Sequence, residues 1–504
     1  MTGRPDRVAS FALAYLSLPA LVFCVGWLET VPGVMLSLLI FAAVAPLFLH
    51  LSIADISPPQ PAALAWLFAL AALWAGLGGA GHFVFANPDW QTRDAVYSDL
   101  IFGTWPPAYR LDGDIHLVLR SATGFFLAPA ALAKIAGIGA ARWLLYAWSA
   151  LGTLLFLLLL PLPARLGPRL VLLSLAVVGF SGLDYPAILT VHGHTPMFPL
   201  PLEWWRPWTY TSLSGQLFWA PNHALPLWLG TALILRHRDS DALPAVVLVL
   251  LPVALLWTPF AIGLLPWAAW ALWQRRQPVA TLLRATEPFQ WAAALALTAV
   301  LLAYLSRPGM EATPLAFDSF SNSAGGAAAG WSTVETAIAY LQFAAFEFGI
   351  LALLLRPATV ASRQMLALAL TLLLALPLLR LGPSNDWMLR ISTPCLVALL
   401  VLVLAEFSGP AIELRRSWRA AGLVVVLATG AITPGFEIAR ALLWKPTPPN
   451  YGQSLVEAQR GYLAPHYLGK LDLPLLQLLF KVPTLVPPGK DRLTPAKQGF
   501  PRPS

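Results

Sequence analysis

The chain has 504 residues, of which 58% are hydrophobic and only 11% are charged, and its mean hydropathy is +0.68. Soluble globular proteins carry roughly 25% charged residues, so these values exclude a soluble enzyme. The net charge of +8 does not indicate a nucleic-acid partner, because the Arg residues are mostly scattered at the ends of apolar runs. Cys24 and Cys395 both lie inside apolar runs, so we expect neither a disulfide nor a Cys-ligated metal site.

The apolar runs predict an all-α polytopic membrane protein. A spanning helix needs about 20 apolar residues, and no polar linker divides the hydrophobic part into separate domains. We therefore expect one bundle over residues 1–440 and a small C-terminal tail over residues 441–504. About 13 transmembrane helices are predicted, at 9–28, 32–52, 61–85, 141–161, 169–183, 217–235, 242–257, 259–273, 289–305, 334–355, 364–381, 390–407 and 419–440.

Basic residues in the short loops predict how the bundle is oriented. Arg pairs and triplets recur after every second predicted helix, from Arg4 and Arg7 to Arg415, Arg416 and Arg419. The positive-inside rule then places the N-terminus in the cytoplasm. Long loops at 86–140, 184–216 and 306–333, together with the tail, fall on the outer face. The apolar segment 123–138 is short and contains Pro129 and Lys134, so we interpret it as an interfacial or re-entrant helix.

The first outer loop carries the candidate catalytic carboxylates, Asp89 and Asp94. If residues 90–102 are helical, Asp89 faces Arg93 one turn later. A partly buried carboxylate at the mouth of an apolar bundle suits general-base catalysis, and an arginine beside it suits a phosphate leaving group. The alternative is that Asp89, after Asn87 and Pro88, is simply the N-cap of this helix.

The second outer loop and the helix after it carry further polar and aromatic residues. The loop contains Glu203 and Arg206 within a tryptophan-rich stretch, which is typical either of a membrane anchor or of a surface that stacks on sugars and lipids. Gln216, Asn222 and His223 follow at the outer end of the next helix. Polar groups within apolar helices usually face the interior of a bundle, so these three are candidate substrate-binding residues.

A polar break, LGPSNDWMLRISTP, places four more candidate residues at the outer end of the bundle. Charged groups this close to lipid are costly unless they are paired or face a cavity. Asp386 and Arg390 are four residues apart and could simply pair. Alternatively, Arg390 binds a phosphate, with Arg380 and Asn385 beside it, because a guanidinium is always charged and matches phosphate geometry.

This arrangement resembles the GT-C superfamily of membrane glycosyltransferases, which use polyprenyl-phosphate sugars. The likeness covers the layout of residues 61–310: an early outer loop with carboxylates, an interfacial segment, then AARWLLYAWSALGTLLFLLLLPLPARLG. The stretches NPDWQTRDAVYSDLIFGTWPPAY, FWAPNHAL and PSNDWMLRISTP are similar to segments of a group of bacterial membrane proteins with a GT-C-like layout. The resemblance implies a catalytic base in the first loop, at Asp89 or Asp94. The chain departs from the family in two ways: its carboxylates follow the third helix, and the loop has no tandem acidic pair.

The predicted function is the transfer of a sugar from a polyprenyl-phosphate donor to a glycan, lipid or protein acceptor. The reaction is placed on the outer face of a bacterial cytoplasmic membrane. We expect no metal or other cofactor, because arginine can stabilise the phosphate, and no nucleic acid as a partner. The alternatives are a transporter or flippase and a non-catalytic subunit of a polysaccharide assembly system. Glu335 and Glu347 are the clearest ionisable residues within the spans, and ion-coupled transport normally uses several.

Overall fold

The computed structural model describes residues 4–53, 58–111, 115–120, 122–202, 208–307, 309, 316–317, 332–380, 385–408, 418–459 and 465–489. It is 71% helix and 5% strand, as expected for an all-α membrane protein. Within these ranges, eight helical segments are long and apolar enough to cross a membrane: Arg7–Trp27, Thr30–His50, Ile138–Leu159, Pro288–Leu305, Thr333–Leu354, Val360–Leu378, Asp386–Glu406 and Trp418–Leu443. The count of about 13 transmembrane helices is not confirmed.

Several predicted spans are shorter or interrupted in the structure. The segment predicted as one helix over 217–235 divides at Ala220, whose φ of −155° and ψ of 56° leave the helical region just before Pro221. The last predicted span likewise divides at Ala431 into two helices. Four further apolar helices have only 10–17 residues: α3 (Pro61–Leu77), α5 (Gly124–Ala136), α7 (Pro168–Val178) and α11 (Leu243–Trp257).

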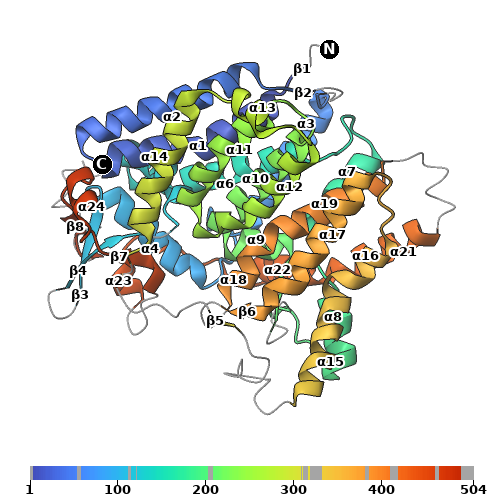
Figure 1. Ribbon diagram of the computed structural model, residues 1–504. Coiled ribbons are helices and arrows are strands. Elements are labelled where there is room, and N and C mark those ends of the chain that lie inside the picture. Colours follow the sequence, from blue (N-terminus) through green and yellow to red (C-terminus); the bar gives the residue numbers. More distant parts are fainter. Residues whose placement is uncertain are drawn as a thin grey trace.

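Helix α10 (Pro221–His237) lies at the centre of the bundle and is buried along almost its whole length. It packs against α6 (Ile138–Leu159), α11 and α19 (Thr393–Glu406), and its first turn carries Asn222 and His223. The remaining long helices surround this centre (Figure 1). They are α1 (Arg7–Trp27), α2 (Thr30–His50), α12 (Leu265–Gln274), α14 (Pro288–Leu305), α15 (Thr333–Ala344), α17 (Val360–Ala375), α21 (Trp418–Gly430) and α22 (Ile432–Leu443).

Shorter elements form the two ends of the bundle. The end with the N-terminus, at the top of Figure 1, has the two-stranded sheet of β1 (Arg4–Pro5) and β2 (Ser52–Ile53) and helix α13 (Val279–Arg284). The opposite end has α4 (Asp89–Phe102), α18 (Asp386–Ile391), α23 (Leu455–Ala458) and the pair β5 (Ala316–Phe317) and β6 (Leu379–Arg380).

The C-terminal segment is built into the first loop through a four-stranded sheet. The hairpin β3 (Pro107–Leu111) and β4 (Ile115–Leu119) forms its middle, with β7 (Leu468–Gly469) beside β4 and β8 (Thr484–Leu485) beside β3. Helix α24 (Pro474–Leu479) joins the two outer strands. The described part of the predicted tail therefore shares one sheet with the first outer loop.

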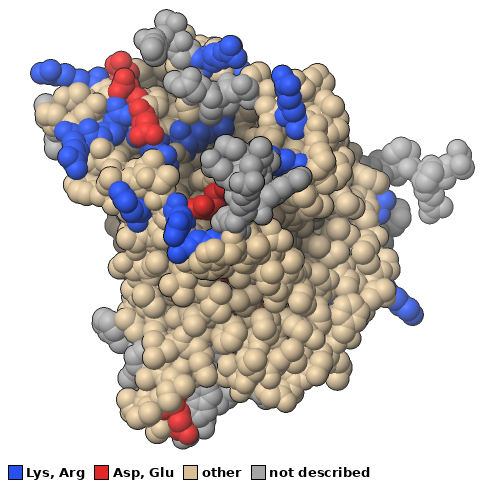
Figure 2. Space-filling model, turned by 90° about the vertical axis from the view of Figure 1, so that its right-hand side faces the viewer, with Lys and Arg blue, Asp and Glu red and all other residues tan. Residues whose placement is uncertain are grey.

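Charged side chains are distributed unevenly over the surface. On the face drawn in Figure 2, Lys and Arg gather at the upper end, which is the end of the N-terminus in Figure 1, and a broad uncharged belt lies below them. Such a belt is the surface that a bilayer covers, and a basic rim is typical of the cytoplasmic side. The direction of insertion remains a prediction.

Candidate functional site

Helix α4 positions the carboxylates of the first loop. Asn87 fixes the helix start, because its Oδ1 accepts the N–H of Asp89 at 3.1 Å while its Nδ2 donates to the Phe218 carbonyl at 2.7 Å. Asp89 is therefore the first helical residue and does not itself cap the helix by a side-chain hydrogen bond. Its carboxylate sits near the helix N-terminus, where the helix dipole favours a negative charge.

Asp89 and Arg93 form the predicted ion pair along α4. Arg93 Nη2 lies 3.1 Å from Asp89 Oδ2 and also donates to the carbonyl of Trp219. The Arg93 side chain is only 8% exposed, whereas that of Asp89 is 48% exposed. Arg93 Nη1 is buried and has no hydrogen-bond partner among the described residues. A buried charged donor without a partner in the described residues therefore lies beside an accessible carboxylate.

Helix α18 supplies the second arginine. Asn385 caps this helix with a left-handed backbone conformation, and its Oδ1 accepts the N–H of Met388 at 3.5 Å. One turn on, Arg390 lies 3.6 Å from Asp386, too far for a good hydrogen bond. Arg390 Nε is buried and has no partner in the described part of the chain. The predicted Asp386–Arg390 pair is therefore present but loose.

Tyr467, from the C-terminal segment, lies within electrostatic reach of charges on both helices. Burial raises the pKa of its phenol; the positive charges of Arg93 and Arg390 oppose that rise, and the negative charges of Asp89 and Asp386 add to it. All four charges thus lie within electrostatic reach of one side chain. Charges of the first loop and of the polar break before α19 therefore act on the same side chain.

His223 adds the first turn of α10 to this cluster, and Asn222 precedes it on the same turn. The charges of Arg390 and Arg93 both reach His223, whose Nδ1 lies 2.7 Å from Thr258 Oγ1. Asn222 is buried, and its Oδ1 has no hydrogen-bond partner within the described ranges. Together with Asp89, Asp386 and the two arginines, these residues form what we call the arginine site.

Among the other predicted binding residues, Gln216 lies outside the arginine site. Gln216 is buried in the bundle core, where Trp228 donates to its Oε1 at 2.8 Å and its Nε2 donates to the Thr211 carbonyl at 2.9 Å. It is a packing residue of the core. The backbone of Arg380 pairs with Ala316 in β6, and its side chain is outside what the structure describes. Glu203 and Arg206 lie outside the described residues.

Asp94, the second candidate base, has a structural role. Its side chain is fully buried and lies 3.0 Å from His82 Nε2, and it accepts the Asn450 N–H at 2.9 Å. His82 Nδ1 in turn contacts the Thr447 carbonyl at 2.7 Å. Asp94 therefore holds the C-terminal segment against α4, and both its oxygens are occupied.

The His82–Asp94 contact predicts a pH dependence of stability. Burial lowers the pKa of His82, but the hydrogen bond and the charge of Asp94 outweigh it, so the folded-state pKa lies above 6.5. The pair therefore stabilises the fold fully below the unfolded pKa, and this contribution is lost as pH rises through the folded value. We expect the unfolding temperature of the wild type in detergent to fall more steeply than that of His82→Gln as the pH rises from the unfolded to the folded pKa of His82. Equal slopes for the two proteins would contradict the assignment.

Sequence reasoning did not find the contribution of the C-terminal segment. Tyr467 and Asn450 lie in a region interpreted as a small separate tail, and His82 lies in one interpreted as a membrane span. The one usable signal was composition, because the segment after residue 441 is more polar than the bundle yet contains aromatic residues. His466, beside Tyr467, is also within electrostatic reach of Asp386, Arg120 and Arg390.

No family model, curated protein or solved structure matches this chain. The resemblance to GT-C enzymes therefore stays a prediction, and the function has to be inferred from the site. The described residues contain no group of three or more His, Cys, Asp and Glu side chains that could hold a metal ion. Arg93 and Arg390 each keep one buried nitrogen without a partner among the described residues, and an anionic ligand would offset the cost of leaving it unsatisfied.

Proposed function

We propose that the protein is a membrane glycosyltransferase that moves a sugar from a polyprenyl-phosphate donor to an acceptor on the outer face of a bacterial cytoplasmic membrane. One observation carries the proposal. Arg93 and Arg390 come from distant parts of the chain, lie in mutual electrostatic reach, and each keep a buried N–H without a partner in the described ranges. A phosphate is the group that such paired guanidiniums bind best.

The arrangement supports a single displacement at the sugar. Asp89 takes the proton of the acceptor hydroxyl, whose oxygen forms a bond to the anomeric carbon as the bond from that carbon to the phosphate oxygen breaks. The polyprenyl phosphate leaves with the bonding electron pair. Arg93 and Arg390 stabilise the charge that develops on it. The 48% exposure of Asp89 leaves its carboxylate open to an acceptor.

Arg390→Gln tests the phosphate-binding part of the proposal. Hydrogen bonds to charged groups contribute roughly 1.5–3 kcal/mol, so we expect the variant to bind polyprenyl phosphate about ten- to a hundredfold more weakly. Binding would be measured by titrating the purified protein in nanodiscs. Arg307→Gln is the matched control, because Arg307 is exposed and paired with Asp472 outside the arginine site. Equal losses in both variants, or no loss in Arg390→Gln, would contradict the proposal.

The same preparation separates transfer from transport. A glycosyltransferase converts polyprenyl-phosphate sugar and acceptor into product, and Asp89→Asn stops that conversion. A transporter or flippase would instead move substrate across sealed vesicles, and the movement would survive Asp89→Asn. Transport without product formation in the wild type would overturn the proposal in favour of this alternative.

A further inference from the structure

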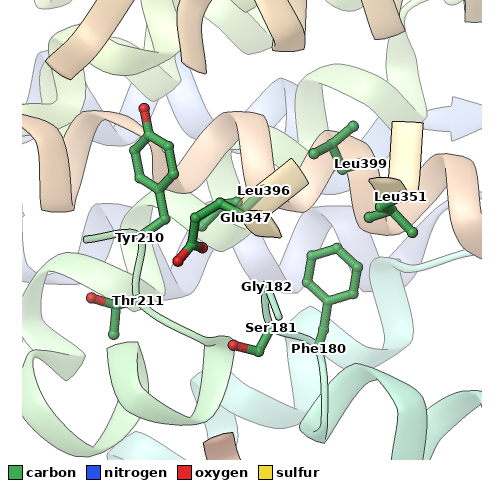
Figure 3. Close-up of a pocket in the computed structure, with 9 residues that line it drawn as sticks. All are labelled: Phe180, Ser181, Gly182, Tyr210, Thr211, Glu347, Leu351, Leu396 and Leu399. Carbon is green, nitrogen blue, oxygen red and sulfur yellow. The ribbon is translucent and has the colours of Figure 1, made fainter. Parts of the chain in front are cut away.

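A second group of buried polar residues lies outside the arginine site, around α8 (Asp184–Ala187). It adjoins a small pocket bounded by apolar side chains together with Ser181, Tyr210, Thr211 and Glu347 (Figure 3). Figure 3 shows the Glu347 carboxyl in the space between Tyr210, Thr211 and Ser181. The proposed reaction uses none of these residues.

Asp184 and Glu347 bring two carboxyl groups together in this region. Asp184 is 1% exposed and Glu347 is 6% exposed. Asp184 Oδ2 accepts the hydroxyl of Thr433 at 3.0 Å and that of Ser181 at 3.3 Å. Asp184 Oδ1 is buried and receives no hydrogen bond from a hydroxyl, amide or ring donor of the described residues. The neighbouring acidic side chain is that of Glu347, whose Oε2 packs against Gly182, two residues before Asp184.

The backbone is shaped to bring Glu347 close to Asp184. Glu347 lies in a π-helical turn, Ala345–Gly349, and such turns inside α-helices occur frequently at functional sites. The N–H of Leu183 donates to the Phe346 carbonyl at 3.1 Å, which fixes the loop against that turn. A Cβ atom on Gly182 would lie 2.3 Å from Glu347 Oε2, so only glycine leaves room for the carboxyl here.

Two buried carboxyl groups that lie this close together need a proton between them. Both are acceptors only when ionised, and two like charges at that distance inside a protein cannot both persist. The shared proton would turn one of them into a donor, as in other paired carboxyls. In an apolar bundle the doubly ionised state is further disfavoured by desolvation.

We propose that Asp184 and Glu347 form a proton-binding site that shares one proton at neutral pH. The other titratable groups facing it are the Tyr210 phenol and, around that phenol, Tyr340 and Cys395. Helix α22, which supplies Thr433, also carries Glu437 and Arg440, which form an ion pair of their own. Tyr185 adjoins Asp184 within α8, and Arg419 is the charged residue of α21, which also packs on α8.

Infrared spectroscopy of the protein in liposomes tests the proposal. The wild type should show the C=O stretching band of one buried protonated carboxyl at about pH 7, and the band should shift in D₂O. We expect Asp184→Asn and Glu347→Gln each to abolish it, because the new amide N–H takes the place of the shared proton. Glu335→Gln is the control: Glu335 is an exposed capping-box residue at the start of α15, and its loss should leave the band unchanged.

Other results would overturn the proposal. These are a wild-type spectrum without the band, persistence of the band in either single variant, or its loss in Glu335→Gln. Gly182→Ala keeps both carboxyls but must displace Glu347, so it provides a test if a carboxyl variant fails to fold. We expect it to shift the band, and an unchanged band would place the proton elsewhere. None of these results depends on glycosyl transfer, so the two proposals can fail separately.

Discussion

Asp89→Asn is expected to lower the rate of sugar transfer by about 10²- to 10⁴-fold, the usual contribution of a general base. The amide keeps the size of the side chain and can still accept a hydrogen bond from Arg93, but it cannot take a proton from the acceptor. Because Asp89 is half exposed, its ion pair with Arg93 contributes little to stability. Transfer would be measured in membranes supplied with polyprenyl-phosphate sugar, beside a thermal unfolding curve of the same preparation.

The control for this experiment is Asp472→Asn. Asp472 is another partly exposed aspartate paired with an arginine, Arg307, and it lies outside the arginine site. The Asp472→Asn variant should transfer sugar at the wild-type rate. If Asp89→Asn transferred sugar as fast as the wild type while remaining folded, Asp89 would not be the base.

Asp94→Ala is expected to destabilise the protein by about 3–5 kcal/mol, the usual cost of removing one partner of a buried ion pair. The substitution would leave the buried His82 ring and the Asn450 N–H without their common acceptor. We also expect the segment from Thr447 onward to become sensitive to protease, since Asp94 and His82 tie it to α4. Denaturant unfolding in detergent and limited proteolysis would measure the two effects.

A double-mutant cycle with His82→Ala separates the two roles predicted for Asp94. If its role is structural, the cycle should show strong coupling between residues 82 and 94, and the remaining folded Asp94→Ala protein should still transfer sugar. A stable Asp94→Ala protein that has lost all transfer would instead make Asp94 the base.

Local spacing was enough to predict the parts of the arginine site that lie within one helix. Asp89 and Arg93, like Asp386 and Arg390, are four residues apart and do meet on one helical face. The rule that polar groups near lipid face inward also placed Asn222 and His223 correctly. Gln216 also faces inward, but its amide oxygen accepts from Trp228 in the core and it lies outside the arginine site.

Contacts between distant parts of the chain could not be predicted from the sequence, because they leave no local signal in it. Nothing in the spacing of residues 465–489 indicates that Leu468 pairs with Leu119, or that Tyr467 enters a site formed by α4 and α18. The helix count is not confirmed, for a related reason. Hydropathy measures how apolar a stretch is, and it does not detect where a residue such as Ala220 leaves the helical conformation.

The four-stranded sheet has a consequence for how the protein is made. Its central hairpin is synthesised early, whereas β7 and β8 emerge more than 300 residues later, so for most of translation the hairpin has two open edges. Tyr467 takes its place beside Arg93 only when β7 has paired with β4. A chain that ends before Leu468 would therefore contain the long apolar helices of the bundle but lack two strands of this sheet and Tyr467.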